Sequence, residues 1–130
     1  MTNRREIDGE RQRRERRSRL KRGGRGELAA ALLLMAKGYR ILARQYRSPH
    51  GEIDLIAVRA RRIAFVEVKR RASIEDGQAA LTPQQARRVA NAADHWLSRH
   101  RAYQDHEIGL DAVLVVPWRV PRHLPNVLEA

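Results

Sequence analysis

The sequence lacks cysteine and has no long hydrophobic run. Without cysteine, its 130 residues can form no disulfide, thiol nucleophile or thiolate metal site. The longest apolar run, residues 28–36, is nine residues long, against the ~20 that a helix needs to cross a bilayer. A secretory signal would require an apolar segment after the N-terminal arginines, and the sequence has none there. We therefore expect a cytoplasmic protein with no membrane partner.

Aromatic and histidine patterns are also sparse. Aromatic residues make up 5% of the chain, too few and too scattered for the stacking platforms that hold single-stranded nucleic acids. The five histidines show no paired spacing typical of a zinc site. A duplex or branched nucleic acid is the better-fitting partner.

Charge is what the chain has in excess. The formal net charge is +12, which favours a polyanionic partner, most simply nucleic acid. Half of that excess lies in residues 1–22, which carry ten basic and four acidic residues and almost nothing apolar. We expect these residues to be a disordered basic arm, either merely solvated or gripping phosphates.

The remaining chain has the composition and size of one small domain. Hydrophobic residues make up 42% of the sequence, enough for one modest core. We assign residues 23–120 to this domain and describe residues 121–130 as a C-terminal tail without an assignable element. A helix that is apolar on most of its circumference, and should therefore be buried against a sheet, is expected over residues 25–37, and a strand over residues 39–47.

The second half of the pattern completes an α/β domain. Strands over residues 52–58 and 63–69 form a hairpin, followed by a polar loop at residues 70–80. Thr82 and Gln85 frame a capping box for a helix that ends near residue 99. Residues 108–116 form a strand buried on both faces. The order α-β-β-β-α-β predicts a mixed β-sheet flanked by helices.

The hairpin register places charged residues together. If Ala60 and Arg61 form a two-residue turn, the strands match core to core only in one parity. That parity opposes Val58 with Ile63, Ile56 with Phe65, Asp54 with Glu67 and Glu52 with Lys69, and it puts Ile53, Leu55 and Ala57 on the other face.

Two opposed carboxylates need compensation. In this register the Cβ atoms of Asp54 and Glu67 would lie ~4.5–5.5 Å apart, where like charges are destabilising. A hard divalent cation such as Mg²⁺ would offset them, and Lys69 points to the same face. Such a set suits phosphodiester hydrolysis. The alternative is an ordinary charged pair on a solvated strand. The scarcity of lysine, three against 24 arginines, favours a specific need for an ammonium group at Lys69.

These segments resemble a known family. The segments are Gly26-Glu27 at a helix start, Gly51-Glu52-Ile53-Asp54-Leu55-Ile56, Phe65-Val66-Glu67-Val68-Lys69 and Leu81-Thr82-Pro83 before a basic helix. Together they resemble the bacterial YraN-like family, whose members are predicted nucleases of the PD-(D/E)xK superfamily, akin to archaeal Holliday junction resolvases. The resemblance implies a restriction-endonuclease-like fold and a magnesium-dependent endonuclease that acts on double-stranded or branched DNA, and it suggests a homodimer.

The resemblance also implies roles for individual residues. Asp54 and Glu67 would bind Mg²⁺, or Mn²⁺ in its place, with the Val68 carbonyl as a further ligand and Lys69 as the catalytic lysine. Glu27 would complete the site, or would only favour the helix N-terminus.

Other residues have secondary roles. Glu52 would pair with Lys69 or line the site. Gln85 stands where relatives carry a lysine, so it either leaves a phosphate contact missing or closes the capping box. The basic pairs after the site and in the second helix would hold phosphates or be solvated: Arg70, Arg71, Arg87 and Arg88.

Two other functions stay open. The first is a nucleic-acid-binding module on the same fold with weak or lost catalysis. The second is an interaction protein whose basic arm recruits an acidic partner. Asp111 lies in a strand expected to be buried, so it should have a structural partner there.

Overall fold

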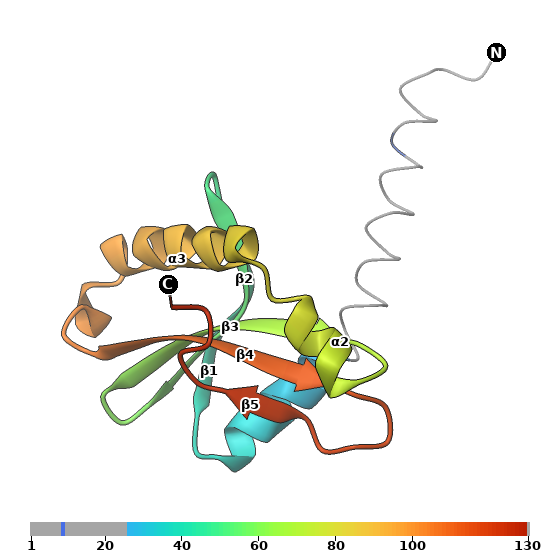
Figure 1. The fold of residues 1–130 in the computed structure, drawn as a ribbon. Helices are drawn as coiled ribbons and strands as arrows, with labels where there is room; N and C mark the ends of the chain where they lie inside the picture. Colours follow the sequence, from blue (N-terminus) through green and yellow to red (C-terminus); the bar gives the residue numbers. More distant parts are fainter. Residues whose placement is uncertain (1–8, 10–25, 130) are drawn as a thin grey trace.

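A five-stranded mixed sheet forms the middle layer of the computed structural model, with the strands in the order β1-β2-β3-β4-β5 (Figure 1). β3 and β4 are parallel, and the other neighbouring strands are antiparallel. The strands are β1 (Arg40–Ser48), β2 (Gly51–Arg59), β3 (Arg62–Arg70), β4 (Glu107–Val115) and β5 (Arg122–Leu124). The predicted α/β class is therefore confirmed.

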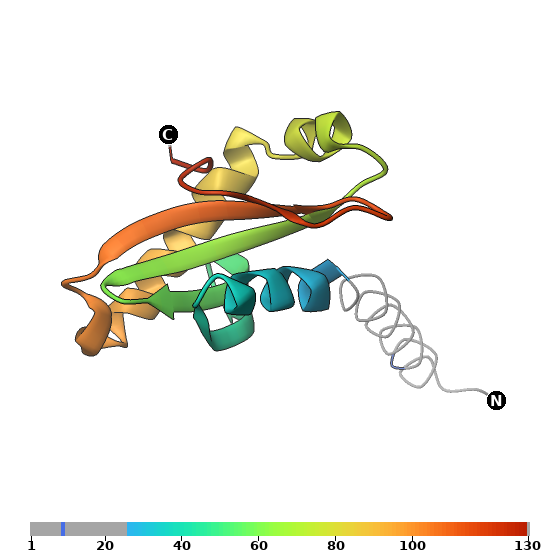
Figure 2. The ribbon, with the colours of Figure 1, turned by 90° about the horizontal axis from the view of Figure 1, so that it is seen from below.

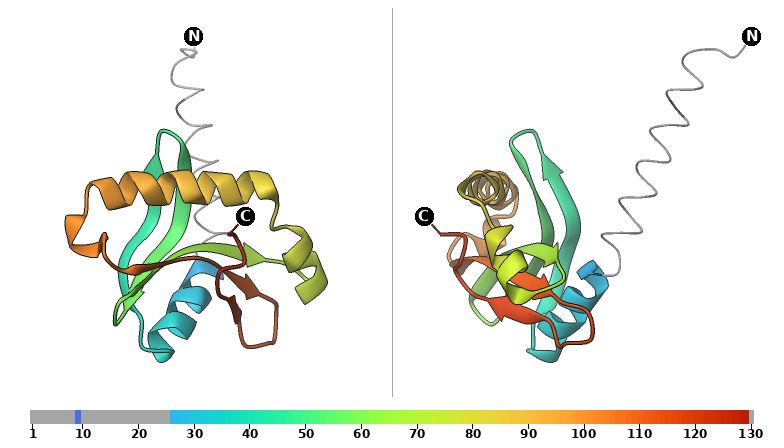
Figure 3. Two further views of the ribbon diagram at one scale, coloured as in Figure 1. Left: turned by 60° about the vertical axis from the view of Figure 1, so that its left-hand side comes forward. Right: turned by 45° about the vertical axis from the view of Figure 1, so that its right-hand side comes forward.

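The structure describes residue 9 and residues 26–129. The predicted basic arm, residues 1–22, lies outside this range apart from residue 9. Helix α3 (Pro83–Ser98) covers one face of the sheet, and helical residues 26–36 cover the other (Figure 3, right). None of the helices in the described residues combines the length and apolarity needed to cross a membrane.

The hairpin of β2 and β3 has the predicted register. Val58 pairs with Ile63, Ile56 pairs with Phe65, and Ala60 and Arg61 form the two-residue turn. Ala60 adopts a φ of 51°, in the left-handed region that such tight turns require. The alternating hydrophobic pattern thus fixes the pairing, because a slip by one residue would expose the core face.

Two separate cores lie on the two faces of the sheet. One lies between the sheet and α3 and includes Phe65 and Trp96, and the other lies under residues 26–36 and includes Leu34 and Leu55. Ile53 belongs to the α3 core together with Ile56. The prediction that Ile53 shares a face with Leu55 is wrong, because β2 departs from strict alternation between these residues.

Helix α3 begins as its sequence predicts. Thr82 is the N-cap, and its side chain accepts a hydrogen bond from the Gln85 amide at 3.2 Å. The helix also contacts the start of β2 closely: a Cβ at residue 51 would lie 1.9 Å from the Arg88 carbonyl oxygen. Gly51 is therefore required here for a close approach of two backbones.

Two segments differ from the sequence prediction. Residues 70–80 were expected to be a loop, but they contain helix α2 (Ile74–Ala79), whose N-cap Ser73 accepts from the Asp76 amide. The segment described as a C-terminal tail contains β5, and Leu128 beyond it is buried in the α3 core. A short 3₁₀ helix, η1 (Arg101–Tyr103), joins α3 to β4.

The helix at residues 26–36 buries only one side. Ala30 and Leu34 are fully buried, while Leu28, Leu32 and Met35 remain about half exposed. The expectation that this helix is buried against the sheet is confirmed, although a single sheet face covers only one stripe of it (Figure 2).

Candidate active site

The candidate site lies where β2 separates from β3. The ladder between the two strands ends at the pair Leu55 and Val66. One residue further along β2, the Asp54 carboxylate accepts a hydrogen bond from the Val68 amide at 2.7 Å. A side-chain oxygen thus takes the place of a backbone acceptor at the point where the ladder stops.

Asp54 has the electrostatic signature of a functional acid. Burial, followed by the Glu67 carboxylate, raises the pKa of Asp54 from 3.8 to about 7, against the opposing effects of the Val68 amide and Lys69. Glu27 also raises it. A carboxyl group near other acids and inside the protein favours its protonated form unless a cation neutralises it.

Glu67 and Lys69 form an ion pair beside Asp54. The Lys69 Nζ atom lies 3.1 Å from Glu67 Oε1, and the two side chains are 11% and 14% exposed. Alternation along β3 puts both on the face of Phe65, as predicted. The only lysine in β3 therefore lies next to one of the two acids that the sequence assigned to a metal.

Glu27 reaches the same region from the helix at residues 26–36. It is only 4% exposed, and its two carboxylate oxygens accept hydrogen bonds from Arg44 Nε and Gln45 Nε2, both at 2.9 Å. Arg44 and Gln45 were missed as site residues. The available signal was two adjacent polar residues that break the alternation of β1. Glu27 is thus more than a helix-terminal charge.

The predicted cross-strand pairs are not formed in full. Asp54 and Glu67 are electrostatic neighbours, but the ladder between β2 and β3 ends at Leu55 and Val66, before the two acids. Glu52 does not pair with Lys69. It lies 3.9 Å from both Arg47 and Arg88, is 53% exposed, and therefore belongs to the solvated rim.

Gln85 forms half of its predicted capping box. Its amide caps onto Thr82, but its side-chain oxygen Oε1 is buried without a hydrogen-bond partner in the described structure. The four arginines that the sequence assigned to nucleic-acid binding are all exposed: Arg70, Arg71, Arg87 and Arg88. Arg71 continues the sheet by donating its amide to the Val115 carbonyl at 3.1 Å.

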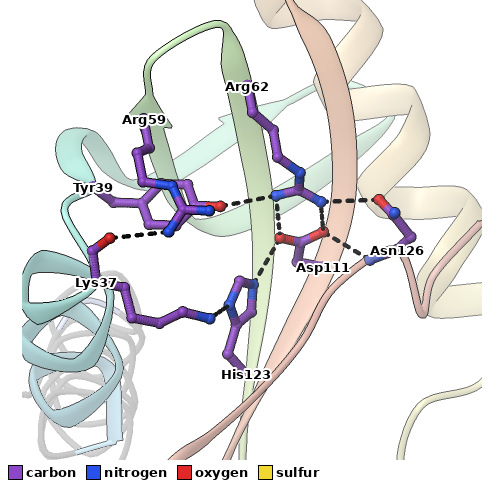
Figure 4. Close-up of polar contacts among 7 residues, drawn as sticks. All are labelled: Lys37, Tyr39, Arg59, Arg62, Asp111, His123 and Asn126. Carbon is purple, nitrogen blue, oxygen red and sulfur yellow. Dashed lines mark hydrogen bonds and ion pairs between the residues drawn. The ribbon is translucent and has the colours of Figure 1, made fainter.

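A second buried acid is held in a quite different way (Figure 4). Asp111 is 0% exposed and accepts two hydrogen bonds from Arg62, one from His123 and one from the Asn126 amide, all at 2.8–2.9 Å. Burial alone would raise the pKa of Asp111, but these hydrogen bonds lower it to about 2. The prediction of a structural partner is confirmed.

The Asp111 network extends to the surface. His123 also contacts Lys37, and burial followed by the neighbouring Arg59 lowers the pKa of Lys37. Gly109 makes room for this arrangement, because a Cβ there would lie 2.1 Å from the Arg62 guanidinium. The network ties β5 and the chain end to the sheet.

The donor set limits how a metal could be held. In the part of the chain that the structure describes, no three acidic, histidine or cysteine side chains are grouped so as to hold a metal ion. Glu27 is already engaged by Arg44 and Gln45. Asp54 and Glu67, whose charges act on each other, therefore remain as the two carboxylates that could bind an ion together. Any ion here would need water, backbone or substrate oxygens in addition.

Comparison with known proteins gives a consistent result. Residues 26–115 match the family model described as "Uncharacterised protein family UPF0102". A UPF0102 protein of Rhodopseudomonas palustris (strain BisB18) is 48% identical over 116 residues, covering 89% of this chain and 86% of that protein. A UPF0102 protein of Bradyrhizobium diazoefficiens is 48% identical with 89% and 87% coverage. One of Nitrobacter winogradskyi is 49% identical over 104 residues, with 80% and 88% coverage.

Proposed function

The chain belongs to the uncharacterised protein family UPF0102, and we propose that it is a divalent-metal-dependent endonuclease that hydrolyses DNA phosphodiester bonds. The family model spans the sheet from the first helix to the end of β4. The segments that carry the resemblance to PD-(D/E)xK nucleases, around Asp54, Glu67 and Lys69, lie within it.

The observation that carries this proposal is the environment of Asp54. A carboxyl group with a pKa raised to about 7 stands at the open end of a hairpin, beside a second acid that is ion-paired to a lysine. A purely structural aspartate would have a permanent cationic partner, as Asp111 has in Arg62. Perturbed acids of this kind mark functional sites more often than structural ones.

Mg²⁺ or Mn²⁺ fits this donor set with help from other oxygens. Asp54 and Glu67 would be its protein ligands. A strand residue directs its amide and carbonyl to the same side, and the Val68 amide points to Asp54, so its carbonyl oxygen is the natural third ligand. Waters and a substrate phosphate would fill the remaining positions, as is usual for Mg²⁺.

The chain's own residues supply the rest of the chemistry. A bound metal ion would polarise the scissile phosphate and lower the pKa of the attacking water. Lys69 orients that water or balances the negative charge that develops on the phosphoryl oxygens. The attacking water gives up a proton to bulk solvent as its oxygen forms a new bond to phosphorus, the bond to the leaving oxygen breaks, and a proton from solvent completes the leaving hydroxyl group.

Cleavage of end-labelled DNA tests the proposal. Duplex, flap and four-way junction substrates are incubated with the full chain and Mg²⁺ or Mn²⁺, and with Asp54→Asn and Lys69→Met. We expect each variant to cleave at least about 100-fold more slowly. Asp105→Asn is the matched control, because it makes the same chemical change at an exposed position just before the opposite end of β4.

The outcomes separate the proposal from its main rival. Cleavage that persists unchanged in both variants contradicts the assignment of these residues. The rival is a nucleic-acid-binding module, favoured by Gln85 at the position where the resemblance to PD-(D/E)xK nucleases implies a lysine. It predicts salt-sensitive DNA binding that is equal in wild type and Asp54→Asn, with no metal-dependent cleavage of any substrate.

A further inference from the structure

The loop between β4 and β5 carries the most exposed large hydrophobic side chain of the described residues. Trp118 has a relative accessible area of 103%, so the fold leaves its indole in solvent. The loop is short and anchored on both sides, because Leu114 pairs with Arg122 across it. Trp118 lies midway between these two residues, at the end of the hairpin.

The backbone of this loop holds Trp118 outward at a conformational cost. The Arg119 amide donates to the Val116 carbonyl at 3.3 Å, which closes a four-residue turn. Pro117 is the second residue of that turn, and Trp118 is the third with a φ of 66°. Glycine is the favoured residue at such a position, and a bulky side chain there is a conformational outlier. Such outliers tend to persist at functional positions.

This loop projects from the end of the sheet that holds the candidate site. Lys69 pairs with Leu114, and Trp118 follows Leu114 by four residues. An extended chain spans at most ~3.6 Å per residue and neighbouring strands lie ~5 Å apart. The Cα atoms of Trp118 and Lys69 are therefore within about 20 Å, or roughly six nucleotide rises. The loop, the end of β3 and α2 lie at one end of the molecule (Figures 1 and 2).

The surroundings of Trp118 are basic. Four exposed arginines flank it in sequence or across the sheet: Arg70, Arg71, Arg119 and Arg122. None of the four takes part in an ion pair with another described residue. The nearby acids on α2 are Glu75 and Asp76. Cations outnumber carboxylates here, so a polyanion is the occupant that this surface favours.

We propose that Trp118 stacks on an unpaired or terminal nucleobase while the arginines around it hold the adjoining phosphates. This inference rests on the proposed nuclease function and narrows its substrate to DNA with an exposed base, such as a flap or a branch. Inside a duplex the bases already stack on one another, so an indole finds a free face only at an end or a branch. Each base stacks on its own aromatic side chain, so a single tryptophan is enough to hold a single exposed base.

Binding without cleavage tests the inference. Fluorescence anisotropy in EDTA compares the full chain with Trp118→Ala and Trp118→Phe on a flap and on a dumbbell duplex of equal length whose ends are closed by non-nucleotide linkers, so that it has no free end and no unpaired base. We expect Trp118→Ala to weaken flap binding about 5- to 100-fold, to change dumbbell binding less than twofold, and Trp118→Phe to restore most of the flap affinity. Arg119→Gln is the matched control, because losing a phosphate contact weakens both substrates alike and flattens the salt dependence.

Each other result has a definite meaning. Equal flap affinity in wild type and Trp118→Ala overturns the inference, even if cleavage by Asp54 and Lys69 is found. A selective loss with Trp118→Ala supports it, even if no substrate is ever cut. Binding to anionic phosphatidylglycerol vesicles that Trp118→Ala abolishes, with DNA binding unchanged, would assign the loop to a membrane surface instead. The same flap made of RNA shows whether Trp118 stacks on a DNA base, as proposed, or on an RNA base instead.

Discussion

Asp54 and Asp111 are both aspartates within hydrophobic strands, yet their surroundings differ in nearly every respect. Asp111 receives four hydrogen bonds from Arg62, His123 and the Asn126 amide, and its pKa falls to about 2. Asp54 accepts one hydrogen bond, from the Val68 amide, lies near Glu67, and has a pKa raised to about 7.

The contrast separates a structural acid from one suited to chemistry. The fold provides Asp111 with a permanent cation, so its charge stabilises the protein at neutral pH. Asp54 has its nearest lysine already paired to Glu67, so its charge is incompletely compensated. A site that costs stability in the free protein and gains it from a ligand is what function requires, and the two acids can be compared by the same measurements.

The largest effect is expected at Asp111. Asp111→Ala leaves Arg62 buried without its partner, so the free energy of unfolding should fall by about 3–5 kcal/mol at pH 7. Because the pKa of Asp111 is lowered, its stabilising contribution is present above pH ~4 and is lost as the pH falls toward 2. Urea unfolding followed by circular dichroism measures this. Asp105→Ala is the exposed control, and a loss below 1 kcal/mol at Asp111 would contradict the structural role.

The opposite sign is expected at Asp54. In EDTA at pH 8, the free energy of unfolding of Asp54→Asn should exceed that of wild type by about 4 kcal/mol, because the pKa of Asp54 is raised to about 7. The pKa of Asp54 is raised, so between pH ~4 and ~7 the folded protein keeps a proton that the unfolded chain releases, and wild type loses stability as pH rises. The two proteins should be equally stable near pH 4. A less stable Asp54→Asn variant at pH 8 would show that the carboxylate is structurally satisfied.

The sequence alone predicts part of the hairpin that carries Asp54, but not all of it. Period-two alternation and the Ala60-Arg61 turn are enough to predict the register of β2 and β3, because a slip would expose the hydrophobic face of the strands. The same rule fails at Ile53, since both faces of the sheet are hydrophobic and the pattern contains no sign that the Asp54 carboxylate will accept from the Val68 amide.

Other misses have local causes. The Asp111 partners come from β3, β5 and the turn after it, and sequence spacing does not reveal which distant arginine a buried acid will meet. Ser73 and the acids at Glu75 and Asp76 are suitable for a helix start, but the six residues of α2 are too short for a hydrophobic period. Tryptophan side chains are largely buried on average. Residue type therefore does not predict that the turn at Trp118 leaves its indole in solvent.

Metal addition provides a smaller effect on the same pair. At pH 8, Mn²⁺ at ten times its dissociation constant should stabilise wild type by about 1.4 kcal/mol, which corresponds to a rise of about 5 °C in Tm. EDTA should reverse it. Asp54→Asn should lose this shift, whereas Asp111→Asn, studied over its own lower melting range, should keep it. An equal Tm shift in Asp54→Asn would place the ion elsewhere.

The smallest effect is expected at Glu52, a third carboxylate that serves as the solvated baseline. Its two arginine contacts, Arg47 and Arg88, are at 3.9 Å and the side chain is 53% exposed, a geometry in which ion pairs contribute at most about 0.5 kcal/mol. Glu52→Gln should therefore change the free energy of unfolding by no more than about 0.5 kcal/mol, leave its pH dependence unchanged, and keep any cleavage rate within twofold of wild type. Paired urea and cleavage assays measure this. A cleavage loss above tenfold with unchanged stability would move Glu52 from the rim into the active site, and Asp54 would then share its role with a solvated acid.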